Sequence, residues 1–240
     1  MEQTEELEAV RRLALTVSVA TVTTRLFTRG LRRCAMRGVA PLRSGVRLAG
    51  WAYTLRYVPS REDLDQLDVF RDPDHPQRYA VEHVPAGSVL VMDARGDTDA
   101  ATFGSILATR LKVRGAAGVV SDGPVRDAAT IRALNLPVFS AGAHPSTNLC
   151  RHHAVDTQVA IGCGGVLVEP GDLLVGDDDG VVVVPRKWAK AVIAEAVDQD
   201  ELEAFLASRV AGGEPLRGTY PPSAETLAVY EATCDKTLRH

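Results

Sequence analysis

The sequence lacks any apolar stretch approaching the roughly 20 residues that a membrane-spanning helix needs. It also lacks a block of basic residues, and its net charge is −4 over 240 residues. These absences argue against a membrane partner and against nucleic acid bound by electrostatic attraction. The first residues, Met1–Glu6, are acidic where a secretory leader is basic. We therefore expect a cytoplasmic protein with neither a membrane nor a nucleic-acid partner.

Cysteine pairs and the common nucleotide or nucleophile motifs are also missing. The four cysteines lie far apart without a C-x-x-C spacing: Cys34, Cys150, Cys163 and Cys234. Such spacing favours reduced thiols over a disulfide framework or a zinc ribbon. The sequence contains no P-loop, no G-x-G-x-x-G and no G-x-S-x-G. Readings as an NTPase, a dinucleotide-binding dehydrogenase or an esterase therefore lose their usual support.

Two clusters of residues that could bind a metal ion are better explained without one. The acidic run at 177–180, Asp-Asp-Asp-Gly, lacks the alternating spacing of a calcium loop and favours a hairpin turn. Cys150, His152 and His153 are close in sequence. Neighbouring residues of a strand point to opposite faces, so we do not expect these two histidines to share a zinc ion.

The hydrophobic pattern predicts an α/β fold. Helical spacing appears at 4–15, 19–33, 100–114 and 187–210, and strand patterns appear at 43–58, 88–92, 117–121, 137–139, 155–161, 165–168, 173–175 and 181–184. The alternation of strand and helix between 88 and 139 indicates parallel strands joined by crossover helices. The polar region 59–85 is predicted to be a long loop, and the Gly/Pro-rich tail from residue 212 carries no predicted element.

The segment Gly115–Asp127 is the strongest candidate for a functional site. A short apolar run leads into a Gly-Pro turn that ends in Arg126 and Asp127. Arginine presents a planar fork of donors to a carboxylate, and aspartate is a hard oxygen ligand for Mg²⁺. The competing interpretation is a surface ion pair at the start of a helix.

A second candidate is the stretch Gly104, Ser105, Ile106 and Leu107. If a helix begins there, its free backbone N–H groups could bind a carboxylate oxygen. The alternative is that Gly104 only allows close packing inside a longer helix, and Phe103 favours this alternative because it continues the helical spacing.

These residues resemble those of the RraA-like family, which includes a regulator of ribonuclease E activity and class II 4-hydroxy-4-methyl-2-oxoglutarate/4-carboxy-4-hydroxy-2-oxoadipate aldolases. The resemblance lies in residues 87–93, 104–127, 136–139 and 170–185. It implies a single RraA-like domain, 1–240, with a core at about 16–210 and a C-terminal tail at 211–240. The implied fold is a swivelling β/β/α sandwich with N-terminal helices and a C-terminal helix, assembled as a homotrimer or hexamer with sites between subunits.

The resemblance also implies roles for individual residues. Arg126 would bind the carboxylate of a 2-keto acid substrate, assisted by the backbone of 104–107, and Asp127 would ligate Mg²⁺ or Mn²⁺. A carboxylate from the neighbouring subunit's C-terminal helix contributes in the aldolases, and Glu201 or Glu203 is the nearest candidate. The implied reaction is aldol cleavage or decarboxylation through a pyruvate enolate.

One departure from the aldolase pattern affects proton transfer. The aldolases have an acidic residue where this chain has Ser105, and a serine hydroxyl is too weak a base at neutral pH without help. Asp97, Asp99 or Asp122 could substitute. A non-catalytic regulator that binds a ribonuclease or another protein is the alternative function. The retained Arg126–Asp127 pair favours the metal-dependent lyase.

Overall fold

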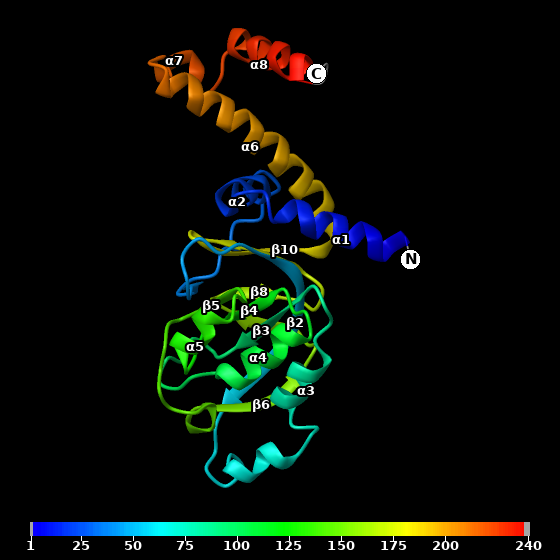
Figure 1. Ribbon diagram of the computed structural model, residues 1–240, viewed down its shortest axis with the longest axis vertical. Coiled ribbons are helices and arrows are strands. Elements are labelled where there is room, and N and C mark those ends of the chain that lie inside the picture. Colours follow the sequence, from blue (N-terminus) through cyan, green and yellow to red (C-terminus); the bar gives the residue numbers. More distant parts are fainter. Residues whose placement is uncertain (1, 238–240) are drawn as a thin grey trace.

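The central feature of the computed structural model, which describes residues 2–237, is a strongly curved mixed sheet (Figure 1). Within the described residues it has eight strands in the order β1-β5-β4-β3-β2-β9-β10, with β6 also pairing with β2. The strands are β1 (Ala40–Pro41), β2 (Leu48–Pro59), β3 (Ser88–Asp93), β4 (Gly118–Ser121), β5 (Val138–Ser140), β6 (His152–Thr157), β9 (Leu173–Asp177) and β10 (Gly180–Val184). A separate hairpin pairs β7 (Ile161–Cys163) with β8 (Val166–Val168).

The parallel part of the sheet confirms the predicted alternation of strands and helices. β2, β3, β4 and β5 are consecutive parallel neighbours, and α4 (Ser105–Val113) and α5 (Ala128–Ala133) connect β3 to β4 and β4 to β5. β3 and β4 are buried along their length, as expected for strands covered on both faces. Their carboxyl ends therefore lie along one edge of the sheet, where α/β proteins commonly place ligands.

The antiparallel part nearly closes the sheet. β9 and β10 form a hairpin in which Gly180 pairs with Asp177, so the acidic run is a turn as predicted. The segment 35–41 reaches both edges: Ala35 bridges to Val182 of β10, and Ala40 pairs with Ser140 of β5. The mixed α/β class and the terminal helices agree with the fold implied by the family resemblance.

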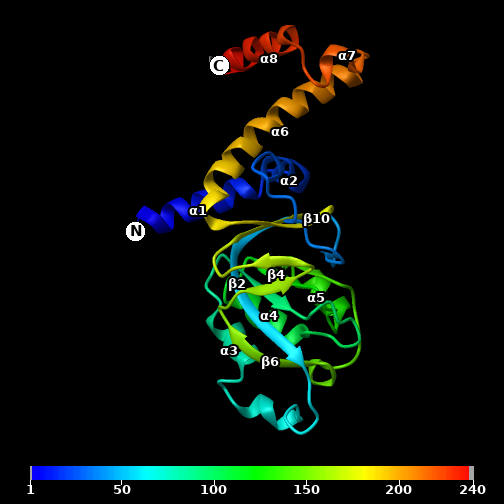
Figure 2. The same cartoon turned by 180° about the vertical axis from the view of Figure 1, so that it is seen from behind.

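Helices from the two ends of the chain cover β9 and β10. These are α1 (Glu2–Ala14), α2 (Val19–Thr28) and the long α6 (Ala189–Ala211), which follows a short 3₁₀ turn, η3 (Arg186–Trp188). The first half of α6 packs against α2 through Val192, Ile193 and Ala196. Its second half leaves the body and carries the C-terminal helices at its far end (Figure 1), as the reverse view also shows (Figure 2). α2 ends at Thr28, short of the predicted residue 33, and is followed by Gly30 with φ of 80°.

Two segments predicted to lack structure are helical. The polar region 59–85 contains η1 (Leu67–Arg71) and α3 (Pro76–His83), because Pro76 starts the helix and buried Gln77, Ala80 and Val81 anchor it. The tail contains α7 (Leu216–Thr219) and α8 (Ala224–Thr237). Phe205 of α6 contacts Tyr230 of α8, with ring centroids 5.3 Å apart. Most Gly and Pro residues that suggested a loose tail lie in the joints between these helices, and Gly218 lies within α7.

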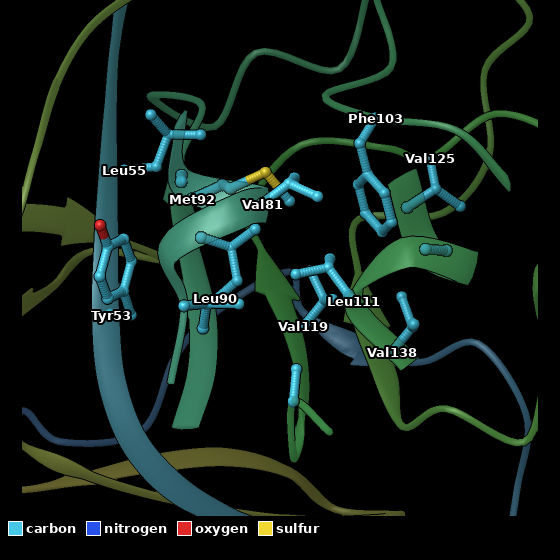
Figure 3. Close-up of a cluster of buried hydrophobic side chains, with 14 of the residues drawn as sticks. Tyr53, Leu55, Val81, Leu90, Met92, Phe103, Leu111, Val119, Val125 and Val138 are labelled. Atoms are coloured by element: carbon cyan, nitrogen blue, oxygen red, sulfur yellow. The ribbon is translucent and has the colours of Figure 1, made fainter. Parts of the chain in front are cut away.

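The main hydrophobic core lies between the parallel strands and helices α3 and α4. Leu90 and Met92 of β3, Val119 of β4 and Leu111 of α4 meet there (Figure 3). A second cluster lies under α1, α2 and α6, and a third lies on the other face of the sheet. The first and third clusters thus pack against the two faces of the parallel strands.

No helix within residues 2–237 is both long and apolar enough to cross a bilayer. Cys34 and Cys163 are buried free thiols and Cys150 is an exposed one. The side chain of Cys234 lies outside the described residues.

Replacing Gly118 with alanine is expected to destabilise the fold by about 1–3 kcal/mol, the usual cost of overpacking a core. A Cβ at Gly118 would lie 2.4 Å from Leu48 Cδ1 and 2.6 Å from the backbone oxygen of Pro137. Gly162 is the matched control, since a Cβ there meets nothing within 4 Å and its backbone is not left-handed. Thermal unfolding measures both variants. Equal melting temperatures for Gly118→Ala and Gly162→Ala would contradict the packing described here.

Candidate functional site

The loops that follow β3, β4 and β5 run side by side and extend the parallel sheet. Phe103 bridges to Val125, and Val125 bridges to Ala143, both in parallel register. The Arg126 N–H donates to the Phe103 oxygen at 3.0 Å, and the His144 N–H donates to the Val125 oxygen at 2.9 Å. This ladder brings three loops, far apart in sequence, to one edge of the sheet.

Gly104 lies before α4 rather than inside it, which corrects the predicted helix at 100–114. It is the N-cap residue, with φ of −132° and ψ of −174°, and α4 begins at Ser105. Phe103 is held extended by its pairing with Val125, and Thr102 donates its N–H to the Pro124 oxygen. These long-range hydrogen bonds keep residues 102 and 103 out of the helix, although the apolar spacing of residues 100–103 is helical.

A side chain at Gly104 would collide with the charged pair. A Cβ there would lie 2.9 Å from Asp127 Oδ2 and 3.0 Å from Arg126 Cγ. Glycine thus lets Arg126 and Asp127 approach the first turn of α4. We refer to Gly104, Ser105, Arg126 and Asp127 together as the Arg126–Asp127 site.

Asp127 is fixed in an unusual conformation with its carboxylate turned toward α4. It is the N-cap residue of α5 with φ of 59°, a left-handed conformation that only a few per cent of non-glycine residues adopt. Its Oδ2 accepts the Ser105 N–H at 3.2 Å and the Ser105 hydroxyl at 3.0 Å. These bonds, followed by the charge of Arg126, lower the pKa of Asp127 below its ordinary value. The carboxylate is therefore charged at neutral pH, and its side chain is 43% exposed.

Arg126 retains its capacity to bind an anion. Its one ion-pair contact among the described residues is with Asp127, with Nε 3.8 Å from Oδ2. That distance is too long for a hydrogen bond, and the side chain is 46% exposed. The guanidinium fork is thus available for a carboxylate from solution.

Ile106 and Leu107 follow Ser105 in the first turn of α4, so their backbone lies near this pair, but their side chains do not face it. Ile106 points outward and is 83% exposed, whereas half-buried Leu107 packs against the main core. Glu201 and Glu203 lie on the half of α6 that leaves the body (Figure 1), and Glu203 accepts a hydrogen bond from Gln199 at 2.7 Å. Within one chain, neither glutamate reaches the Arg126–Asp127 site.

The three aspartates considered as substitutes for the missing acid have other partners. Buried Asp122 accepts the backbone N–H groups of Ala94, Gly96 and Gly164 at 2.6, 3.0 and 3.2 Å. These bonds tie together two loops, and burial raises the pKa of Asp122. Asp97 accepts Arg151 Nε at 2.9 Å, and an Asp99 oxygen lies 3.8 Å from Arg151. All three aspartates thus have partners other than Arg126 and Asp127.

His144 is a polar residue at this edge that the sequence analysis missed. It follows β5 and lies next to Val125 in the ladder, on the side away from Phe103. The signal was available in the sequence, since a histidine shortly after a third predicted parallel strand is expected at the same edge.

The residues fit a divalent cation that keeps most of its water. Asp127 supplies one exposed carboxylate, and no group of three or more His, Cys, Asp or Glu side chains suited to a metal occurs in the part of the chain that the structure describes. Mg²⁺ commonly binds through one or two carboxylates plus water and substrate oxygens.

The two histidines of β6, His152 and His153, point to opposite faces of the strand, as predicted. His152 is buried and its Nε2 lies 3.1 Å from the Ala100 oxygen. His153 points the other way, with Nδ1 2.8 Å from Asp65 Oδ1. Adjacent strand residues thus serve separate contacts.

The fold and these residues define an α/β protein with a candidate anion and cation site at the carboxyl edge of its parallel strands. The family model described as RraA-like, Aldolase/RraA, matches residues 19–183, and the chain belongs to the RraA-like family.

Three relatives show how far the similarity extends. The chain is 34% identical over 158 residues to "Putative 4-hydroxy-4-methyl-2-oxoglutarate aldolase" of Halalkalibacterium halodurans, covering 66% of this chain and 69% of that protein. It is 28% identical over 190 residues to Protein DlpA of Legionella pneumophila, covering 78% of this chain but only 30% of that protein. The crystal structure of Streptomyces coelicolor RraAS2, described as an unusual member of the RNase ES inhibitor RraA protein family, matches with a TM-score of 0.75 and 34% identity, covering 84% of this chain and 98% of that one.

Proposed function

We propose that the protein is a divalent-metal-dependent lyase that acts on a pyruvyl-type 2-keto acid by aldol cleavage or decarboxylation. The observation that carries the proposal is the Arg126–Asp127 pair, held against the first turn of α4 by the hydrogen bonds from Ser105 to Asp127. Similarity to the Halalkalibacterium protein, whose name describes an aldolase, supports this class.

The chain's own residues have distinct roles in this proposal. Arg126 binds and orients the substrate carboxylate through its guanidinium fork. Asp127 holds the cation, and Ser105 keeps the Asp127 carboxylate charged and in place. When bound, Mg²⁺ or Mn²⁺ supplies positive charge that stabilises an enolate. Decarboxylation needs only a later protonation of that enolate, so it tolerates serine at position 105 better than aldol cleavage does.

We place the complete site between subunits of a homotrimer or hexamer. The outward half of α6 bears Glu201 and Glu203 and extends away from its own body (Figure 2), so it is positioned to contact another subunit. Light scattering measures the assembly. Pyruvate release that persists in Glu201→Gln and Glu203→Gln would remove both residues from the site.

The first test is pyruvate release by the purified protein from oxaloacetate and from 4-hydroxy-4-methyl-2-oxoglutarate, with and without Mg²⁺ or Mn²⁺. We expect metal-dependent release that chelation abolishes. Absence of release from a folded protein with metal supplied would contradict the lyase and favour the second candidate, a regulator that binds a ribonuclease. That candidate is supported by the 34% identity to the Streptomyces structure described as a member of an RNase inhibitor family.

Arg126→Ala is expected to weaken oxalate binding by about 2–4 kcal/mol, the loss expected for a bidentate charge-assisted pair. Isothermal titration with Mg²⁺ present measures it. Arg61 is a matched control, because its exposed side chain pairs locally, with Asp63 at 2.6 Å. Equal oxalate affinity in Arg126→Ala and Arg61→Ala would exclude Arg126 as the carboxylate-binding residue.

A further inference from the structure

The ladder at the site places His144 beside Arg126. Val125 and Ala143 are paired in parallel register, and the His144 N–H donates to the Val125 oxygen at 2.9 Å. The residues that follow this pair, Arg126 and His144, are therefore neighbours on adjacent strands, whose spacing is about 4.8 Å. Gly104, which follows Phe103, occupies the same level on the other side of Arg126.

Strand alternation gives the direction of these side chains. Phe103 and Val125 both point into the main hydrophobic core (Figure 3). In an extended ladder the next residue points to the opposite face. Arg126 does so, since its side chain is 46% exposed and its Cγ lies 3.0 Å from the position of a Cβ at Gly104. His144 is half-buried and at the same level, so the alternation is expected to turn its side chain toward the face that Arg126 occupies.

The loop also determines which ring nitrogen of His144 carries the proton. The Ser146 backbone N–H donates to His144 Nδ1 at 3.2 Å. A nitrogen that accepts a hydrogen bond has no proton of its own, so neutral His144 carries its proton on Nε2. The bond from Ser146 therefore leaves Nε2 as the ring nitrogen of His144 that can donate to a ligand.

We propose that His144 is a substrate-binding residue that donates its Nε2–H to the part of the 2-keto acid beyond the carboxylate held by Arg126. The inference rests on the proposed function. Gly104 and the first turn of α4 flank Arg126 on one side, and His144 flanks it on the other. A substrate whose 2-keto acid group lies on the Arg126–Asp127 site extends over His144, which selects for an acceptor such as a second carboxylate.

The test compares two stable ligands that share a 2-keto acid group, pyruvate and 2-oxoglutarate, by isothermal titration with Mg²⁺. 2-Oxoglutarate differs in carrying a distal carboxylate. We expect the intact protein to prefer it and His144→Asn to lose at least about tenfold of that preference, as for a hydrogen bond to a charged group, while pyruvate binding stays unchanged. Asparagine is chosen because its Oδ1 keeps an acceptor for the Ser146 N–H.

His83→Asn is the control, because His83 is exposed on α3 and stacks on Tyr79. Equal losses for both ligands in His144→Asn, or no loss for either, would overturn the role of His144 while leaving the lyase in place. If the intact protein binds neither ligand, the proposed function fails, and the role of His144 fails with it.

Discussion

Asp127→Asn is expected to abolish metal-dependent binding of oxalate and metal-dependent pyruvate release. Asp127 is the one carboxylate at the Arg126–Asp127 site, and its pKa is lowered by hydrogen bonds from Ser105. The substitution keeps the size of the side chain and an oxygen for the Ser105 donors, but it removes the charge that a hard cation requires. Mn²⁺ titration followed by electron paramagnetic resonance measures the bound ion directly.

Asp63→Asn is the control for loss of a single negative charge. Asp63 pairs with Arg61 in the polar region 59–85, and its side chain is 66% exposed. Mn²⁺ affinity and pyruvate release should be unchanged in this variant. Retention of Mn²⁺ affinity in Asp127→Asn would place the cation elsewhere and refute the assignment of Asp127.

The sequence predicts the sheet well because the buried strands carry a strong local signal. Continuous apolar runs such as 88–92 and 117–121 have few other ways to be buried, and both are strands of the parallel sheet. Helix α3 was missed for the opposite reason. It has few apolar residues, and its buried anchor includes the polar Gln77, which donates to the Thr102 oxygen at 2.7 Å.

The sequence reveals only part of the geometry of the candidate site, because that geometry depends on both local and long-range interactions. Arg126 and Asp127 are adjacent in the sequence, so a local pattern reveals them. The start of α4 at Ser105 depends on pairing between Phe103 and Val125, and the place of His144 depends on pairing between Val125 and Ala143. Such pairings join distant segments, and no local periodicity encodes them. A sequence pattern can propose residues for a sheet edge, but the register determines which of them are neighbours.

Ser105→Asp is expected to increase metal affinity and aldol cleavage together. In the native chain, the Ser105 hydroxyl donates to Asp127 Oδ2 at 3.0 Å. The substitution replaces this donor with a second carboxylate close to the first. Two carboxylates suit a divalent cation, and the new group supplies the base that serine does not provide. Mn²⁺ affinity should rise by at least about tenfold, an effect of 1.4 kcal/mol or more.

The stability of Ser105→Asp should depend on pH in the opposite direction to that of the native protein. In the native chain the pKa of Asp127 is lowered, so the charged carboxylate stabilises the fold at pH values above its unfolded pKa, and this contribution is lost as the pH falls through the folded value. In Ser105→Asp, repulsion between two carboxylates and loss of the hydroxyl donor raise the pKa of the pair. Without metal, the variant should therefore lose stability relative to the native protein as the pH rises from about 4 to 7.

Added Mn²⁺ should restore the stability of Ser105→Asp, because the cation neutralises the repulsion between the carboxylates. Thermal unfolding with metal and with a chelator, at several pH values, measures the effect, and Ser105→Asn serves as the uncharged control. A melting temperature that is insensitive to Mn²⁺ would show that the two carboxylates do not share an ion. Tight Mn²⁺ binding without a gain in aldol cleavage would show instead that position 105 does not limit proton transfer, and the search for the missing acid would then move to a neighbouring subunit.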